Sequence, residues 1–290
     1  MRSLLSKIGI SETDFEYILR AEESLGTQVK ALSEAFFFQR LDRMEALAQV
    51  AALATEEFHK YVLNLLFWLH TIPLMSVEYE KRGIPEEILY ESMTDISYKM
   101  RECRQMRGAT GLEEDWFFLF TDIRLFGLGR LQYEVAEFQH DQYTKHGICL
   151  KKGDRVYSCH IPSSGKLSKE LYMASFQRAY EFFKSELTGP VIPIVCCSYL
   201  LWPPYLESVF PAQSNIRQFV SEFQLLFSRD YTTFGDCWRI FNRRFEGGSK
   251  GLPTDTALRK NFVKYIDAGG NFGYGYGILL YDGVKKDILK

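Results

Sequence analysis

The stretch KHGICLKKGDRVYSCHIPSSGKLSKEL, residues 145–171, decides the fold of this chain. It predicts a hairpin whose second strand ends in a loop of small residues, and that loop opens a helix. The loop and first helical turn have backbone N–H groups without a partner inside the helix, and the helix dipole favours an anion there. A phosphate group is therefore the ligand that this turn is best suited to bind.

The bulk composition is typical of a globular protein. The 290 residues suffice for one large domain or two ordinary ones, and 46% of them are hydrophobic, which supports a full core. The formal net charge of −2 does not suggest a nucleic-acid partner. The six cysteines show no C-x-x-C spacing, which argues against a structural zinc site. We expect no metal cofactor.

Two further features bear on where the protein works. The N-terminus, MRSLLSKIGISETDFEYI, has no signal-type apolar region before its first acidic residues. The most apolar run, residues 61–75, is too short to span a bilayer and contains a proline. These features predict a soluble, cytoplasmic protein with reduced thiols and no membrane partner.

The two halves of the chain differ in periodicity. Residues 1–126 predict a helical domain, because apolar residues recur at three and four spacing between residues 28 and 69, and Pro85 stands where the first turn of a helix tolerates proline. That helix is expected to run to about Arg107, with another helix over residues 112–126. Residues 127–290 show alternating and buried-strand patterns instead, which predict a second domain built on a sheet.

The second domain is expected to alternate strands with helices. An apolar strand between two helices, as in PVIPIVCCSYL, indicates a mixed sheet, so the fold class is α+β. The pattern predicts strands over residues 128–138, 146–150, 155–161, 190–200, 237–241 and 269–281, and helices over residues 168–186, 215–227 and after Thr254. The turn KKGD, residues 151–154, is predicted to join the second and third strands as a hairpin.

This order of elements looks like the GNAT N-acyltransferase fold. The segments FGLGRLQYE, HIPSSGKL, SFQRAYEFF and CCSYLLWPPYLESVFPAQSNIRQF resemble a family of two-domain bacterial acyltransferase-like proteins, which pair a helical N-acyltransferase N-terminal domain with a GNAT-like C-terminal domain. The resemblance covers most of the chain and is strongest over residues 126–226. The usual GNAT pyrophosphate loop has the form Q/R-x-x-G-x-G/A, whereas this chain has PSSGKLS, with one glycine and two serines before the lysine.

The resemblance implies an acyl-CoA-dependent N-acyltransferase. The donor is then acetyl-CoA or another acyl-CoA, the acceptor is a small-molecule or peptide amine, and transfer is direct in a ternary complex. The residues proposed to bind the cofactor are Ile161, Ser163, Ser164, Gly165, Lys166 and Ser198. The diphosphate is expected on the loop, with Lys166 adding a point charge, and the pantetheine arm between two splayed strand ends. The alternative is an ordinary strand-to-helix connection with Ser168 as N-cap.

The candidate catalytic residues are Glu134, His160 and Tyr199. His160 ends the strand that feeds the loop and has an unperturbed pKa near neutrality, which suits a general base. Glu134, on the first strand of the domain, is the other candidate base, and Tyr199 is a candidate proton donor to the leaving thiolate. Each of these has a structural alternative: a hydrogen-bonded histidine, a solvated strand face, and ordinary packing, respectively.

Two other functions are compatible with these residues. A non-catalytic module that binds acyl-CoA or another ligand, or has a regulatory role, would keep the GNAT shape, and the unusual phosphate loop favours it. Cys197 with His160 would form a nucleophile–base pair for hydrolysis, although a cysteine in a buried strand usually serves as a small hydrophobe.

Overall fold

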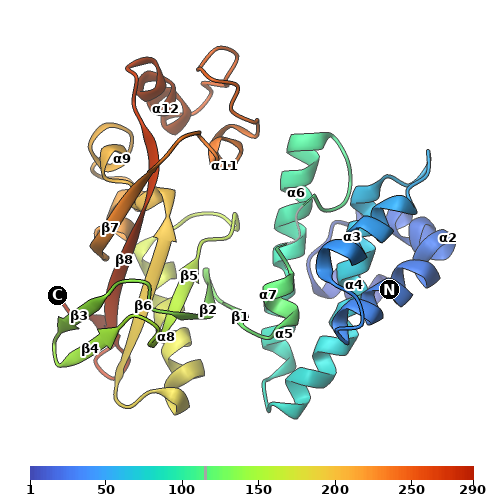
Figure 1. Ribbon diagram of the computed structural model, residues 1–290, viewed down its shortest axis with the longest axis horizontal. Helices are drawn as coiled ribbons and strands as arrows, with labels where there is room; N and C mark the ends of the chain where they lie inside the picture. Colours follow the sequence, from blue (N-terminus) through green and yellow to red (C-terminus); the bar gives the residue numbers. More distant parts are fainter. Residues whose placement is uncertain (114–115) are drawn as a thin grey trace. The chain divides into compact units, whose positions relative to one another are not determined.

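The computed structural model describes residues 1–113 and 116–290. Within them the chain divides into two compact units, of which one comprises Met1–Gly127 with Pro162–Ser164 and the other Leu128–Ile161 with Gly165–Lys290. The first unit is helical and the second is built on a sheet (Figure 1), which confirms the α+β class. Among the described residues, no helix has both the length and the apolar character needed to cross a bilayer.

The helices of the first unit are α1 (Arg2–Lys7), α2 (Glu12–Phe37), α3 (Arg43–Ala52), α4 (Lys60–Lys81), α5 (Glu86–Met93), α6 (Asp95–Arg107) and α7 (Phe118–Thr121). Local sequence sets several of their ends. Asp42 caps α3 by accepting a hydrogen bond from the Met44 N–H at 2.8 Å, and Gly108 ends α6 in the left-handed conformation with φ 66°. The middle of α4 is buried on nearly all sides, with Phe67 and Trp68 in ring contact with Phe36.

The helix expected over residues 112–126 is wrong for most of its length. Among the described residues of this stretch only α7 is an α-helix, and the first strand, β1 (Leu125–Leu128), covers the last two residues of the expected helix. Residues 114 and 115 of that expected helix lie outside the described residues. All four residues of LFGL are buried, as in a core strand. The run therefore lacks the division into an apolar and a polar face that would indicate a surface helix.

The strands of the second unit are β2 (Leu131–Glu137), β3 (Gln142–Lys145), β4 (Ile148–Lys151), β5 (Arg155–His160), β6 (Val191–Ser198), β7 (Gln224–Tyr231), β8 (Phe272–Asp282) and β9 (Asp287–Ile288). Its helices are α8 (Lys169–Phe183), η1 (Lys184–Glu186), η2 (Tyr199–Leu201), α9 (Pro203–Ser208), α10 (Asn215–Val220), α11 (Cys237–Phe241) and α12 (Ala257–Asp267). The main sheet has the order β1-β2-β5-β6-β8-β7, with β9 beside β8, and β5 and β6 are parallel.

The hairpin predicted across the KKGD turn is also wrong. Strand β4 pairs with β3, which the sequence analysis did not identify, and β5 pairs with β2 in the main sheet. His146 and Gly147 both have positive φ, 50° and 78°, and this two-residue turn closes the β3–β4 hairpin. The KKGD segment instead returns the chain to the main sheet, where Asp154 accepts a hydrogen bond from the Lys151 N–H at 2.7 Å.

Two elements late in the chain differ from the expected pattern. The helix expected over residues 215–227 ends at Val220, and strand β7 begins at Gln224. The strand expected over residues 237–241 is the short helix α11. The apolar residues of these segments fit either period over so few positions, so packing against the rest of the unit decides between them.

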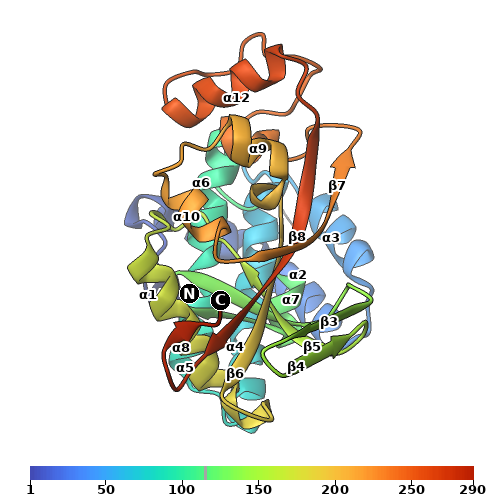
Figure 2. The ribbon, with the colours of Figure 1, turned by 90° about the vertical axis from the view of Figure 1, so that its left-hand side faces the viewer.

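The two faces of the main sheet are covered differently. Helix α8 covers one face, where Tyr133 of β2 shares a hydrogen bond with Ser175 and the ring of Tyr157 contacts Phe183 at 4.2 Å. The β3–β4 hairpin covers part of the other face through Tyr143. Figure 2 shows α8 and this hairpin on opposite sides of β6. The end of β5 that carries the site lies beyond the part of the sheet core to which the hairpin contributes.

Strand β8 carries glycine at alternate positions on the α8 side. A Cβ atom at Gly273 would lie 2.4 Å from the Arg229 carbonyl oxygen and 2.7 Å from the Trp202 ring, and one at Gly275 would lie 2.5 Å from the Leu201 carbonyl oxygen. The alternating glycines therefore let η2 and the residue after it lie directly on the strand.

Candidate functional site

The parallel strands β5 and β6 are hydrogen-bonded over a short length only. Their ladder joins Tyr157 to Ile194 and Ser158 to Val195 and stops there, although β5 continues to His160 and β6 to Ser198. Beyond that point β5 pairs with β2 alone and β6 with β8 alone. The unpaired facing edges leave backbone donors and acceptors of the two strand ends available to a ligand laid between them.

Glu134 and His160 meet at the end of β5. The antiparallel register places Glu134 opposite Ser158, so His160 is its diagonal neighbour on the same sheet face. The His160 Nε2 atom lies 3.0 Å from Glu134 Oε2, and 26% of the histidine and 16% of the glutamate side chain are exposed. The sequence analysis offered these residues as separate candidate bases, whereas the structure brings them together as a hydrogen-bonded pair.

Gln132 and Cys197 lie on the same face as this pair. Gln132 is buried and stands opposite His160 in the register of β2 and β5. Cys197 is near the end of β6 and is exposed to solvent on one side. Partial desolvation of its thiol by the surrounding strands, with the nearby Cys196 and Asp236 adding to the effect, raises the pKa of Cys197 to about 11. A thiol with this pKa is protonated at neutral pH, which disfavours Cys197 as a nucleophile.

Tyr199 does not continue β6 but opens the 3-10 helix η2. Ser198 precedes it, and its hydroxyl accepts a hydrogen bond from the Leu200 N–H at 3.2 Å, which fixes the turn out of the strand. Burial raises the pKa of the Tyr199 phenol to about 12, with smaller and opposed effects from Arg239 and Asp236. The phenol therefore keeps its proton across the physiological range.

Residues from earlier in the chain hold the loop after β5. Ser163 donates its hydroxyl hydrogen to Glu102 at 2.7 Å and accepts a hydrogen bond from Arg101 at its carbonyl oxygen at 3.2 Å. Ser164 has a buried hydroxyl oxygen without a hydrogen-bond partner in the part of the chain that the structure describes. The two serines expected to act together thus have different environments.

Arg130 orients the second half of the loop. Its guanidinium donates to the carbonyl oxygens of Gly165 and Lys166, both at 2.9 Å. The C=O and N–H of a trans peptide point in opposite directions, so the N–H groups of Lys166 and Leu167 are turned away from Arg130. Neither N–H has a hydrogen-bond partner among residues 1–113 and 116–290. Sequence reasoning did not predict these partners of Arg130, because nothing in FGLGRLQYE indicates that they lie 35 and 36 residues later.

The start of α8 completes this loop. Ser168 is its N-cap residue, but its side chain makes no capping hydrogen bond, in contrast to the alternative role expected for it. Gly165 has φ 121°, and a Cβ atom there would meet nothing within 4 Å. In these respects the loop is open and has unsatisfied donors, as an anion site requires. Helix α10, by contrast, has a capped start, because the Ser214 hydroxyl accepts a hydrogen bond from the Arg217 N–H at 3.1 Å.

Comparisons with known proteins agree with this geometry. A family model for a GNAT-like C-terminal domain matches residues 125–279, and one for an N-acyltransferase N-terminal domain matches residues 1–122. A crystal structure of an acyltransferase in complex with decanoyl-CoA and teicoplanin is similar, with a TM-score of 0.71, 21% sequence identity, and coverage of 96% of this chain and 86% of that one. A mutant acyltransferase in complex with octanoyl-CoA gives the same TM-score at 22% identity and the same coverage. No curated protein sequence matches.

The separated parallel strands and the loop before α8 define the class of the second unit, which is a GNAT-like domain. With the helical N-acyltransferase domain matched ahead of it, the chain belongs to the two-domain family that the sequence resembles.

Proposed function

We propose that this protein is an acyl-CoA-dependent N-acyltransferase that transfers the acyl group directly to an amine in a ternary complex. The donor diphosphate binds at residues 163–166, and the pantetheine arm lies between the ends of β5 and β6, near Ile161 and Ser198. The separation of these two strands beside the His160–Glu134 pair is the observation that carries the proposal. The solved neighbours bound to decanoyl-CoA and octanoyl-CoA share this fold and support a CoA thioester as donor.

His160 is the proposed base for the amine. The carboxylate of Glu134 accepts a hydrogen bond from Nε2–H, which selects the tautomer whose Nδ1 atom carries the lone pair. Nδ1 takes the proton as the amine nitrogen attacks the thioester carbonyl. A backbone N–H at the strand ends polarises that carbonyl and stabilises the developing oxyanion.

Tyr199 is the proposed acid for the leaving group. Collapse of the tetrahedral intermediate breaks the C–S bond, and the thiolate of coenzyme A takes the phenolic proton of Tyr199, which its raised pKa preserves until that moment. The products are the amide and free coenzyme A. The His160 imidazolium then releases its proton and the Tyr199 phenolate regains one, both by exchange with solvent, and the enzyme returns to its starting state without an acyl-enzyme.

The first test has two stages. The first asks whether the protein binds an acyl-CoA, and the second asks whether it transfers the acyl group. Thermal unfolding is followed with acetyl-, octanoyl- and decanoyl-CoA, and a shift is expected with at least one of them. Thiol release is then measured with a panel of amines. Teicoplanin belongs in that panel because a solved neighbour of this fold binds it. A thermal shift without turnover on any amine would favour the non-catalytic module, and no shift at saturating donor would contradict both the CoA donor and the assignment of the loop to its diphosphate.

A further inference from the structure

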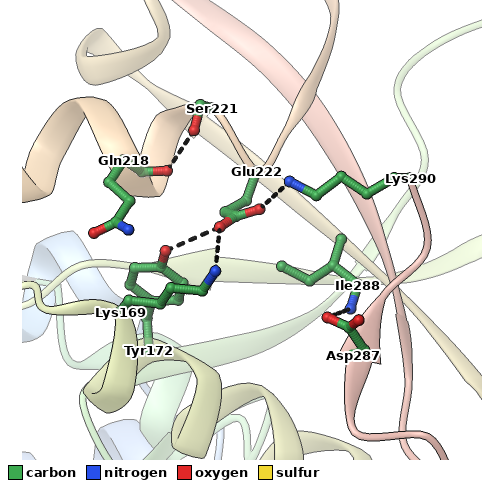
Figure 3. Close-up of polar contacts among 8 residues, drawn as sticks. All are labelled: Lys169, Tyr172, Gln218, Ser221, Glu222, Asp287, Ile288 and Lys290. Carbon is green, nitrogen blue, oxygen red and sulfur yellow. Dashed lines mark hydrogen bonds and ion pairs between the residues drawn. The ribbon is translucent and has the colours of Figure 1, made fainter. Parts of the chain in front are cut away.

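A buried carboxylate with two lysine partners stands at the start of α8 (Figure 3). Glu222 follows α10, and only 4% of its side chain is exposed. Its Oε1 atom accepts a hydrogen bond from the Tyr172 hydroxyl at 3.0 Å and lies 3.9 Å from Lys169 Nζ. Its Oε2 atom accepts a hydrogen bond from Lys290 Nζ at 2.8 Å. Both oxygens of the carboxylate are thus engaged, as burial of a charge requires.

The charges of this cluster do not cancel. One carboxylate faces two ammonium groups, so the three side chains together carry one net positive charge. The carboxylate is inside, whereas 57% of the Lys169 and 73% of the Lys290 side chain are exposed. Each ammonium has three N–H donors. Lys290 uses one of them in its hydrogen bond to Glu222, whereas Lys169, at 3.9 Å, contacts Glu222 as an ion pair only. Glu222 therefore acts as a buried anchor that holds two cations with donors left for solvent or for a ligand.

The position of the cluster relates it to the proposed donor site. Lys169 is the first residue of α8, three positions after Lys166 of the loop. The positive end of the α8 dipole adds to the two ammonium charges at the same place. A dianionic phosphate is the ligand that two fixed ammonium groups and a helix start favour most.

The proposed donor carries two separate phosphate features. Coenzyme A has a diphosphate in its chain and a phosphate monoester on the 3′-oxygen of its ribose. The loop at residues 163–166 is assigned to the diphosphate, so the ribose phosphate needs partners of its own. We propose that Lys169 and Lys290, held in place by Glu222, form the subsite that recognises the 3′-phosphate of the donor. This assignment rests on the proposed function, because it presupposes a CoA donor on that loop.

The experiment compares coenzyme A with 3′-dephospho-coenzyme A by isothermal titration calorimetry. The wild-type protein is expected to bind coenzyme A about tenfold more tightly, as two partly screened ion pairs to one phosphate provide. In the double variant Lys169→Gln/Lys290→Gln, the two ligands are expected to bind with equal affinity. Each single variant is expected to lose about threefold, which keeps the test valid should the double variant fail to fold.

Lys184 provides a matched control. It is as exposed as Lys169, at 57%, and it also pairs with a glutamate, Glu181, but it follows the other end of α8. Lys184→Gln is expected to keep the tenfold preference for coenzyme A. The same preference in the double variant as in the wild type, or an equal loss in Lys184→Gln, would overturn the assignment.

Two further outcomes separate this assignment from its premises. Equal binding of both ligands by the wild-type protein would refute the 3′-phosphate subsite while leaving the proposed function intact, whereas binding of neither would refute the function itself. Competition with adenosine 3′,5′-bisphosphate and with inorganic phosphate distinguishes the source of the anion. The bisphosphate is expected to displace coenzyme A at a lower concentration, and equal competition by inorganic phosphate would show a site for the free ion instead.

Discussion

The protein contains two histidine–glutamate pairs with nearly equal geometry. His70 and Glu22 join α4 to α2 in the helical unit, with Nε2 and Oε2 2.9 Å apart, and His160 and Glu134 join β5 to β2 in the other unit at 3.0 Å. Only 10% of the His70 side chain is exposed, against 26% for His160. The first pair is enclosed between helices that continue past it, whereas the second stands where a ladder of the sheet ends. The surroundings of a pair, more than its contact distance, thus decide whether it can serve chemistry.

The largest difference between the two pairs is expected when each histidine is removed and acyl transfer is measured. His160→Gln is expected to lower kcat/KM by about 100- to 1,000-fold, because the amine then loses its general base. His70→Gln is expected to leave kcat/KM within about twofold of the wild type. Thiol release with the best amine of the panel measures both. An active His160→Gln protein would move the base to another residue.

The next largest difference is expected when the glutamate of each pair, Glu134 or Glu22, is replaced. Glu134→Gln keeps the shape of the pair but no longer selects the Nε2–H tautomer of His160, and kcat is expected to fall about tenfold or more. A purely structural Glu134 would change the free energy of unfolding and leave kcat unchanged. Glu22→Gln serves as the matched control and is expected to leave kcat unchanged.

The third test measures stability, for which His70 is expected to matter more than His160. His70→Gln removes a hydrogen bond between two packed helices and is expected to lower the free energy of unfolding by about 1–2 kcal/mol. His160→Gln, at the more open end of a strand, is expected to cost less than about 1 kcal/mol. Urea denaturation of both variants provides the values. A larger loss in the His160 variant would mean that its pair is chiefly structural.

The smallest expected effect concerns pH. Burial lowers the pKa of His70, and this outweighs the opposite effect of Glu22; Lys30 lowers it further and Glu34 raises it. The folded state then holds a neutral imidazole while the unfolded state binds a proton near pH 6.5. Stability is therefore full above pH 6.5 and declines as the pH falls toward the lowered pKa, by at most about 1.4 kcal/mol per pH unit. The difference in the free energy of unfolding between wild type and His70→Gln should shrink as the pH falls from 8 to 5, and it should stay constant if the pKa is unshifted.

The sequence predicted the elements that its own local chemistry defines. The loop before α8 and the buried strand β6 follow from small residues before a periodic segment and from a continuous apolar run. The β3–β4 hairpin was missed because its turn, His146–Gly147, competes with the glycine of KKGD nearby, and pairing beyond the hairpin decides which turn closes it. Strand β7 and helix α11 were misassigned because five to eight residues do not separate the two periods.

The sequence identified residues of the candidate site, but it did not predict which of them contact one another. His160 and Glu134 were both identified from their place on strands, yet their pairing depends on a register across 26 positions that no local pattern contains. The contacts of Arg130 and of the Glu222 cluster were missed for the same reason, since the partners are distant in the chain. A change of one position in the β2–β5 register would turn Glu134 and His160 to different faces of the sheet.

The alternating glycines of β8 make one side of that strand intolerant of any side chain. A Cβ atom at Gly273, Gly275 or Gly277 would collide with Trp202, Leu201 or Phe223. Even an alanine there is therefore expected to push η2 off the strand and to loosen the second unit.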